Sequence, residues 1–323
     1  MASRPRLTAG GVPATRTATR ERAAIVLLVL AWGTTFAAVK IGLESAPPVL
    51  FAGLRALLGG AVMAVLAWRR TGMPLLAGQG REYTLLTALN VLLFFGLQTV
   101  AIGLLPSGLA AVLVYLQPVL VGLLAWWLLG EPMSAPKILG LVLGFAGIAV
   151  VSGGAFAGQV SAVGVGLAVV SALAWALGTI VFKATAGRVD PWWAVALPFL
   201  VGGALLTVVG LVVEGPDITW SPRFVVALVF AGLVGTALAW SLWFGRVAAG
   251  EAGRAASYIF FVPLVGVVVG AVLLDETLTL SLLVGASLVV LGVYLVNRRP
   301  RVPRTATDTS PRPGRRPGGQ DEA

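Results

Sequence analysis

The stretch VLLFFGLQTVAIGLLPSGLAAVLVYLQPVLVGLLAWWLL, residues 91–129, decides the fold because it contains no charged side chain over its whole length. About 20 apolar helical residues cross a bilayer core, so this stretch is too long for one crossing and suits two. Pro106, Ser107 and Gly108 lie near its middle and favour a tight turn. The stretch therefore predicts a hairpin of two membrane helices.

Apolar stretches of similar length fill most of the remaining chain. Of its 323 residues 58% are hydrophobic and 11% charged, less than half the roughly 25% charged share of a soluble domain. This composition excludes a soluble enzyme, a disordered chain and a fibrous repeat. We predict an all-α polytopic membrane protein with ten transmembrane helices, at residues 24–44, 48–68, 84–104, 109–129, 137–153, 163–183, 192–213, 224–246, 255–274 and 279–297.

The distribution of basic residues predicts the orientation of these helices. With the amino terminus inside, 20 of the 23 lysines and arginines fall on the inner side, and Arg223 alone lies in an outer loop. The positive-inside rule then places both termini in the cytoplasm. The charges thus lie in tails and loops and form no folded basic face, which argues against nucleic acid as a partner. The lipid bilayer is the expected partner.

The chain matches itself at an offset of 143 to 145 residues. AWGTTFAAVK at 31–40 corresponds to AWALGTIVFK at 174–183, and Pro118 and Glu131 correspond to Pro263 and Glu276. Each copy holds five predicted helices, an odd number, so the second copy enters the membrane inverted, as in alternating-access transporters. The predicted organisation is a basic cytoplasmic tail at 1–22, repeats at 23–153 and 162–297, and a disordered cytoplasmic tail at 298–323.

Several of these residues together resemble a known family. The AWG-T-F start of the first helix, Arg55 in the second, the LQP to GEP run from Leu116 to Pro132, and the second copy of the pattern resemble EamA-type transporters of the drug/metabolite transporter superfamily. The resemblance implies a central cavity lined mainly by helices 1, 3, 4, 6, 8 and 9. It also implies export of amino acids, other metabolites or drugs across a bacterial inner membrane, where we expect this multi-pass chain.

Candidate substrate-binding residues lie near the predicted midplane. Trp32 and Trp175 each lie eight residues before a lysine, about 12 Å along the helix, and the two lysines mark opposite membrane faces. Both rings therefore approach the midplane, where stacking and cation–π contacts suit aromatic groups and organic cations. Packing or lipid contact is the alternative. Further polar or aromatic candidates, which can equally bond across helices, are Thr35, Asn90, Gln98, Tyr115, Gln117, Trp243 and Tyr258.

Two prolines and one arginine within the predicted spans indicate helix bends and a buried charge. Pro118 and Pro263 fall within predicted helices and are expected to bend them. Arg55 is the only charge well inside a predicted span, without an acidic partner in any span. It either anchors the helix, by snorkelling outward or by binding backbone carbonyls, or contacts substrate or an anion.

Two charge pairs duplicate in register at opposite faces. Lys40 with Glu276 outside, and Lys183 with Glu131 inside, can each form when that side is closed and break when it opens. The alternative is that these four residues mark helix ends that contact headgroups. No acidic residue lies in the interior of a predicted span, which argues against a buried proton relay. Glu131 and Glu276 at helix ends can still bind protons, so proton coupling and facilitated diffusion both stay open.

The sequence also limits the chemistry. It has no histidine and no cysteine, so we expect no metal site, no cofactor and no enzyme activity. We predict a secondary transporter that exports small organic metabolites by alternating access. A channel, a lipid scramblase or an importer of the same fold is the alternative, and the oligomeric state stays open.

Overall fold

The computed structural model describes residues 14–74, 76–156, 160–185, 187–248, 259 and 261–297. The regular elements in this part of the chain are helices, without a β-strand. In chain order they are α1 (Ala14–Gly42), α2 (Pro48–Thr71), α3 (Gly80–Thr87), η1 (Ala88–Leu93), α4 (Phe94–Leu104), α5 (Ser107–Val114), α6 (Gln117–Leu129), α7 (Ala135–Phe156), α8 (Ala162–Ala184), α9 (Trp193–Val213), α10 (Pro222–Val229), η2 (Phe230–Leu238), α11 (Ala239–Ala248), α13 (Phe261–Leu274) and α14 (Leu280–Asn297).

Within the described residues, eight helical segments are long and apolar enough to cross a bilayer. They coincide with eight of the ten predicted spans. The two remaining predictions coincide with shorter apolar helices at Ala135–Val151 and Phe261–Leu274, so ten crossings stay a prediction. The chain is a polytopic membrane protein whose outward faces carry large exposed apolar side chains, such as Val212 at 79% and Trp127 at 73% exposure.

Helix α1 begins earlier than the apolar pattern predicts. Its backbone is helical from Ala14, directly after Pro13, whereas the predicted span starts at residue 24. Alanine, arginine and glutamate favour helix irrespective of their polarity, so the helix continues beyond the apolar segment. The rest of the two predicted tails lies outside the described residues.

The predicted hairpin of residues 91–129 is confirmed. Helix α4 ends at Leu104 and α5 starts at Ser107, with Pro106 in the turn. A second interruption falls at Tyr115 and Leu116. Because Pro118 has no N–H, it cannot bond the carbonyl of Val114, and the helix restarts with this proline in its first turn. For Pro263, which lies near the start of α13, the residues needed to judge a bend lie outside the described part of the chain.

Two segments widen into π-helix. The segment η1 lies between α3 and α4, and η2 lies between α10 and α11. The two segments occupy equivalent positions of the two repeats, because subtracting the repeat offset of 143 to 145 residues from the numbers of η2 gives a range that overlaps η1. In η2 the Thr236 hydroxyl donates to the carbonyl of Ala231 at 2.9 Å, five residues earlier. Such wide turns are rare and occur frequently at functional sites.

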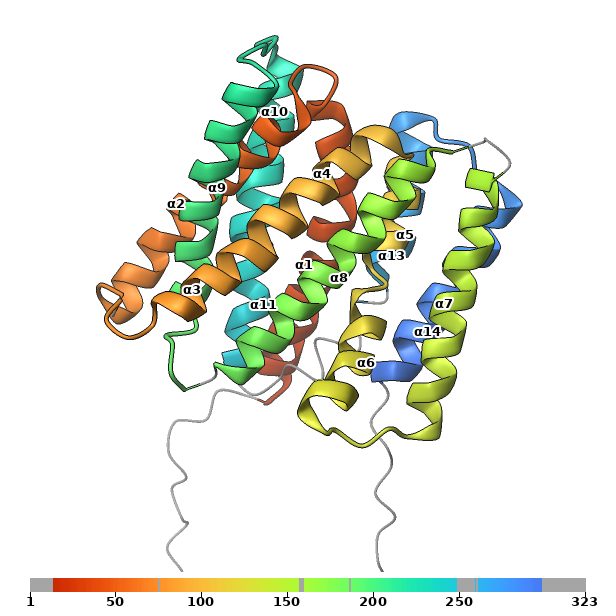
Figure 1. The fold of residues 1–323 in the computed structure, drawn as a ribbon, viewed down its shortest axis with the longest axis horizontal. Coiled ribbons are helices and arrows are strands. Elements are labelled where there is room, and N and C mark those ends of the chain that lie inside the picture. Colours follow the sequence, from red (N-terminus) through yellow and green to blue (C-terminus); the bar gives the residue numbers. More distant parts are fainter. Residues whose placement is uncertain are drawn as a thin grey trace, which may run out of the picture.

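Helices from the two halves of the chain pack side by side (Figure 1). Helix α2 runs antiparallel to α9, and α7 runs antiparallel to α14. Glycines make both contacts close: a Cβ on Gly140 would lie 2.6 Å from the carbonyl oxygen of Gly292, and the reverse distance is also 2.6 Å. Small residues commonly allow this close approach in membranes. Helices α1, α5, α8 and α13 lie between the two pairs (Figure 1).

The two ends of the bundle are held by different polar contacts. At one end, here called the Lys40 end, Glu214 accepts hydrogen bonds from the amides of Val49 at 2.9 Å and Leu50 at 3.0 Å, which caps α2. At the other, the Lys183 end, the indole of Trp193 donates to the carbonyl of Gly72 at 2.9 Å. These contacts tie α2 to α9 at both of their ends.

Candidate functional site

Aromatic rings from four helical segments meet in the centre of the bundle. Trp32 of α1 and Trp175 of α8 are both buried, with ring centroids 6.1 Å apart and edge to face. Trp240 of α11 lies 5.9 Å from Trp32 and 6.2 Å from Trp175. Tyr115, in the break between α5 and α6, lies 5.6 Å from Trp175. The structure therefore brings the two predicted tryptophans into direct contact.

A small cavity of about 30 Å³ lies within this aromatic cluster. Its polar wall is formed by Thr35, Arg55 and Gln98. Six of the predicted site residues line this cavity: Trp32, Thr35, Arg55, Gln98, Tyr115 and Trp175. This volume admits water but is far below the roughly 300–1,000 Å³ of a small-molecule site. We call it the Arg55 cavity.

Arg55 of α2 is only 2% exposed. Its Nη2 donates to Gln98 Oε1 and to Thr99 Oγ1, both at 2.9 Å, and its guanidinium carbon lies 4.3 Å from the centre of the Phe95 ring. Its Nε–H has no hydrogen-bond partner among the described residues. Within the described residues the side chain neither snorkels outward nor bonds to a backbone carbonyl, the two modes of anchoring that the sequence favoured. It lies inside the bundle and binds neutral side chains of α4.

A second cavity, of about 110 Å³, lies on the side of Lys183. It includes the predicted residues Asn90, Trp175, Lys183 and Trp243 in its wall. Trp175 and Trp240 line both cavities, so these two rings form the partition between them. Gln117 lines neither cavity but donates to the hydroxyl of Thr179, a wall residue of the second, at 3.0 Å. Tyr258 lies outside the described residues.

Two glycine contacts fix the polar residues of the walls. A Cβ on Gly178 of α8 would lie 2.2 Å from Asn90 Oδ1, and a Cβ on Gly235 of η2 would lie 2.3 Å from Thr35 Oγ1. The repeat offset pairs Thr35 with Gly178 and Asn90 with Gly235. The same two repeat positions therefore contact each other twice, and the position that is glycine in one contact is the polar residue in the other.

The aromatic residues Phe36, Phe94 and Phe95, together with Thr99, were not among the predicted site residues. Phe94 stacks on Trp175 with centroids 4.8 Å apart. The spacing of Phe95, Gln98 and Thr99, three and four residues apart, places them on one helix face. That face contacts Arg55. The spacing of these three residues is therefore the sequence pattern from which a shared polar and aromatic face could have been predicted.

At the Lys40 end, Lys40 and Glu276 bind the turn between α4 and α5. Lys40 Nζ donates to the carbonyls of Ile102, Gly103 and Leu105 at 2.8 to 3.0 Å. Glu276 accepts from the amides of Ser107 and of Gly108. No ion pair joins Lys40 to Glu276 within the described part of the chain, so the predicted direct outer pair is replaced by two separate contacts with one turn.

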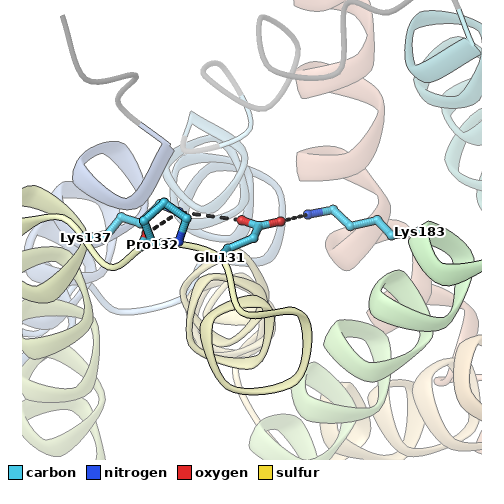
Figure 2. A network of polar contacts seen from close by, with 4 residues as sticks. All are labelled: Glu131, Pro132, Lys137 and Lys183. Carbon is cyan, nitrogen blue, oxygen red and sulfur yellow. Dashed lines mark hydrogen bonds and ion pairs between the residues drawn. The ribbon is translucent and has the colours of Figure 1, made fainter. Parts of the chain in front are cut away.

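At the Lys183 end the predicted inner pair is present. Glu131, just after α6, lies 3.6 Å from the Nζ of Lys183 on α8 and 3.6 Å from that of Lys137 on α7. Figure 2 shows the carboxylate between the two lysines, and Lys137 also donates to the carbonyl of Pro132 at 3.4 Å. The counterpart of the α4–α5 turn in the second repeat, near residue 250, lies outside the described residues.

Comparison with known proteins identifies the family. Residues 22–153 and 162–298 each match the model of the EamA-like transporter family. The chain belongs to the EamA-like transporter family. Its two matched segments cover both halves of the bundle, and the chain is a multi-pass membrane transporter, which confirms the resemblance seen in the sequence.

Similar EamA-like proteins are known from several bacteria. The chain is 41% identical to the "Uncharacterized transporter YvbV" of Bacillus subtilis over 289 residues, which cover 89% of this chain and 95% of that one. It is 31% identical to a "Probable amino-acid metabolite efflux pump" of Salmonella typhimurium over 293 residues, covering 87% and 96%. A crystal structure with 21% sequence identity superposes with a TM-score of 0.64, covering 86% of this chain and 96% of that one, and so shares the fold.

Proposed function

We propose that this EamA-like protein is a secondary transporter of the bacterial inner membrane that exports small organic metabolites by alternating access. The observation that carries the proposal is the buried Arg55 cavity, lined by aromatic and polar residues from both halves of the chain. Transporter sites lie near the midplane between repeats. The efflux-pump name of the Salmonella relative supports export and amino-acid-like substrates.

The equivalent contacts of the two halves support an inverted repeat with ten crossings. Gly140 meets Gly292 across α7 and α14, and the Thr35 to Gly235 contact has its counterpart between Asn90 and Gly178. Two similar halves that contact each other through equivalent positions can exchange their conformations. This exchange opens a shared site first to one side of the membrane and then to the other.

The charges at the two ends support the orientation. At least six basic side chains lie at the Lys183 end, whereas Lys40 and Arg223 lie at the Lys40 end. The positive-inside rule then makes the Lys183 end cytoplasmic, with both termini on that side. The six are Arg69, Arg70, Arg81, Lys137, Lys183 and Arg188.

The cavities suggest which state of the cycle this conformation represents. Of the two cavities that share Trp175 and Trp240, the larger lies on the Lys183 side, and Lys40 and Glu276 fix the α4–α5 turn at the opposite end of the bundle. These contacts support a conformation closed toward the Lys40 end, in which the Arg55 cavity is too small for an organic substrate. A substrate entering from the cytoplasm would reach the second cavity first, as export requires.

Flux into liposomes tests the proposal. The purified protein is reconstituted and supplied with labelled aromatic and aliphatic amino acids and with organic cations, with and without a pH gradient. We expect saturable flux that is lost in Trp32→Ala and Trp175→Ala, because both rings line the Arg55 cavity. The matched control is Trp127→Ala, since this ring on α6 is 73% exposed on the outer surface.

The outcomes separate the alternatives. Flux that does not saturate with concentration would indicate a channel, and lipid transfer without solute flux would indicate a scramblase. Flux that runs only toward the cytoplasmic face would make the protein an importer. Unchanged flux in both tryptophan variants would assign these rings to packing.

A further inference from the structure

We infer that Arg55 binds a carboxylate of the transported molecule, and that the surrounding rings hold an apolar or aromatic body attached to it. The inference rests on the proposed transport function and narrows its substrates to organic acids and amino acids. It excludes simple organic cations, which the aromatic rings alone would also suit. The observations that carry it are the burial of Arg55, its incomplete hydrogen bonding and the cavity that it lines.

No carboxylate in the described part of the chain balances the charge of Arg55. The side chain is 2% exposed, and no carboxylate forms an ion pair with it in the described residues. Arginine keeps its charge in proteins, so the bundle holds a positive charge at its centre. Carboxylates elsewhere in the described part of the chain bind other groups: Glu44 contacts Arg223, Glu131 contacts two lysines, and Asp190, Glu214 and Glu276 cap helix ends.

The partners of Arg55 orient its guanidinium without neutralising it. Gln98 and Thr99 accept from the same nitrogen, Nη2, and the Phe95 ring lies against the guanidinium carbon. The Nε–H stays buried without a partner among the described residues. A side chain that served only to join α2 to α4 would be replaced at less cost by a neutral one, since an unpaired buried charge is strongly unfavourable.

The shape of a guanidinium matches one ligand group in particular. Its N–H donors form a planar fork that pairs with a carboxylate through two parallel hydrogen bonds. Arg55 shares the wall of its cavity with Trp32, Trp175 and Trp240. A carboxylate on Arg55 would therefore place the rest of the molecule among these rings.

The size of the cavity requires ring movement for binding. About 30 Å³ of free volume holds no organic acid, whereas the neighbouring cavity has about 110 Å³. Trp175 and Trp240 separate the two volumes. We infer that the substrate displaces these two rings on its way from the Lys183 side to Arg55, where the unpaired positive charge attracts its acidic end.

Two pairs of probes that differ in charge test the inference. Phenylacetate and phenethylamine share a ring and differ in the sign of their charge. L-phenylalanine and L-phenylalaninamide differ in the carboxylate alone. Binding to the purified full-length protein is followed by tryptophan fluorescence and thermal stabilisation, and flux is measured in liposomes. The variants are Arg55→Gln, Arg55→Lys and, as a control for charge removal, the exposed Arg81→Gln.

We expect wild-type protein to bind each carboxylate at least about 100-fold more tightly than the matched probe that lacks it. Two unit charges about 5 Å apart at an effective dielectric near 20 attract each other strongly enough to account for a ratio of about 100 in the dissociation constants. Arg55→Lys should keep the preference with weaker binding, because it retains the charge and loses the fork. Arg55→Gln should lose the preference, and Arg81→Gln should keep it. If Arg55→Gln does not fold, the wild-type ratio and Arg55→Lys decide.

The outcomes distinguish this inference from the proposed function. Carboxylate binding without flux would refute transport and keep the Arg55 site. Flux or binding with equal preference for phenethylamine, or a preference that persists in Arg55→Gln, would overturn the Arg55 site and leave transport standing. Failure of both carboxylates to bind up to about 10 mM, ten times the top of the usual KM range, would also overturn it.

Discussion

Lys40 and Glu276 bind opposite sides of the same turn without binding each other. Lys40 donates to carbonyls at the end of α4, and Glu276 accepts from amides at the start of α5. Each charge thus matches the helix end that it meets, since carbonyls favour a cation and amides favour an anion. Together they fix the α4–α5 hairpin at the Lys40 end of the bundle.

This arrangement predicts that exchanging the two charges does not restore function. Lys40→Glu places an anion against carbonyls, and Glu276→Lys places a cation against amides, so the double variant combines both defects. We expect each single variant to lose about 1–3 kcal/mol of stability and most of its flux, and the double variant to recover neither. Thermal unfolding in detergent and liposome flux measure the two effects. Recovery in the double variant would show that the residues act as a direct pair.

The pair at the Lys183 end should respond differently to the same exchange. Lys183 and Glu131 lie 3.6 Å apart with side chains 46% and 40% exposed, so the pair contributes only about 0.2–1 kcal/mol. Because the charges contact each other, Lys183→Glu with Glu131→Lys should regain flux that each single variant loses. Lys137→Met is the control, since Lys137 contacts the same carboxylate but lines neither cavity. A double variant no better than the singles would contradict a role for the pair.

The partition between the cavities predicts a change in accessibility. The chain has no cysteine, so Thr35→Cys introduces a single thiol in the wall of the Arg55 cavity. Adding Trp240→Ala should join the two cavities and raise labelling of this thiol from the Lys183 side severalfold. Trp127→Ala, an exposed ring, should leave labelling unchanged. Equal labelling rates with and without Trp240→Ala would show that this ring does not separate the cavities.

The sequence was sufficient for the features that follow from apolar length and from the repeat. It predicted the hairpin at Pro106, a bend at Pro118, and depths of Trp32 and Trp175 that agree with their contact, because each depends on spacing along one helix or on the equivalence of the two halves. Contacts that depend on the relative rotation of helices were not predictable. The partners of Arg55 on α4 are of this kind.

Charge complementarity alone also gave an incomplete account of the outer residues. The sign and side of Lys40 and Glu276 favoured a direct pair, whereas backbone groups at two helix ends bind both charges. Such groups carry no signature in the sequence, since every helix end has free carbonyls or amides. The exact end of a helix is also what sequence patterns determine least well.

The exchanged glycines of the two repeats lead to a prediction about packing at the cavity walls. A Cβ on Gly178 would overlap Asn90 Oδ1 at 2.2 Å, and a Cβ on Gly235 would overlap Thr35 Oγ1 at 2.3 Å. Gly178→Ala should therefore cost about 1–3 kcal/mol through overpacking and should reduce flux. Gly166→Ala on the same helix is the control, because a Cβ there meets nothing within 4 Å and alanine favours helix over glycine by about 1 kcal/mol.

A second substitution tests whether the overlap with Asn90 is the cause. Adding Asn90→Ala removes the atoms that a Cβ on Gly178 would meet, so the double variant should unfold at a higher temperature than Gly178→Ala alone. Because Asn90 also lines the second cavity, the double variant should recover stability without recovering flux. Full recovery of both would show that Asn90 serves packing alone, and recovery of neither would place the cause in another neighbour of α8.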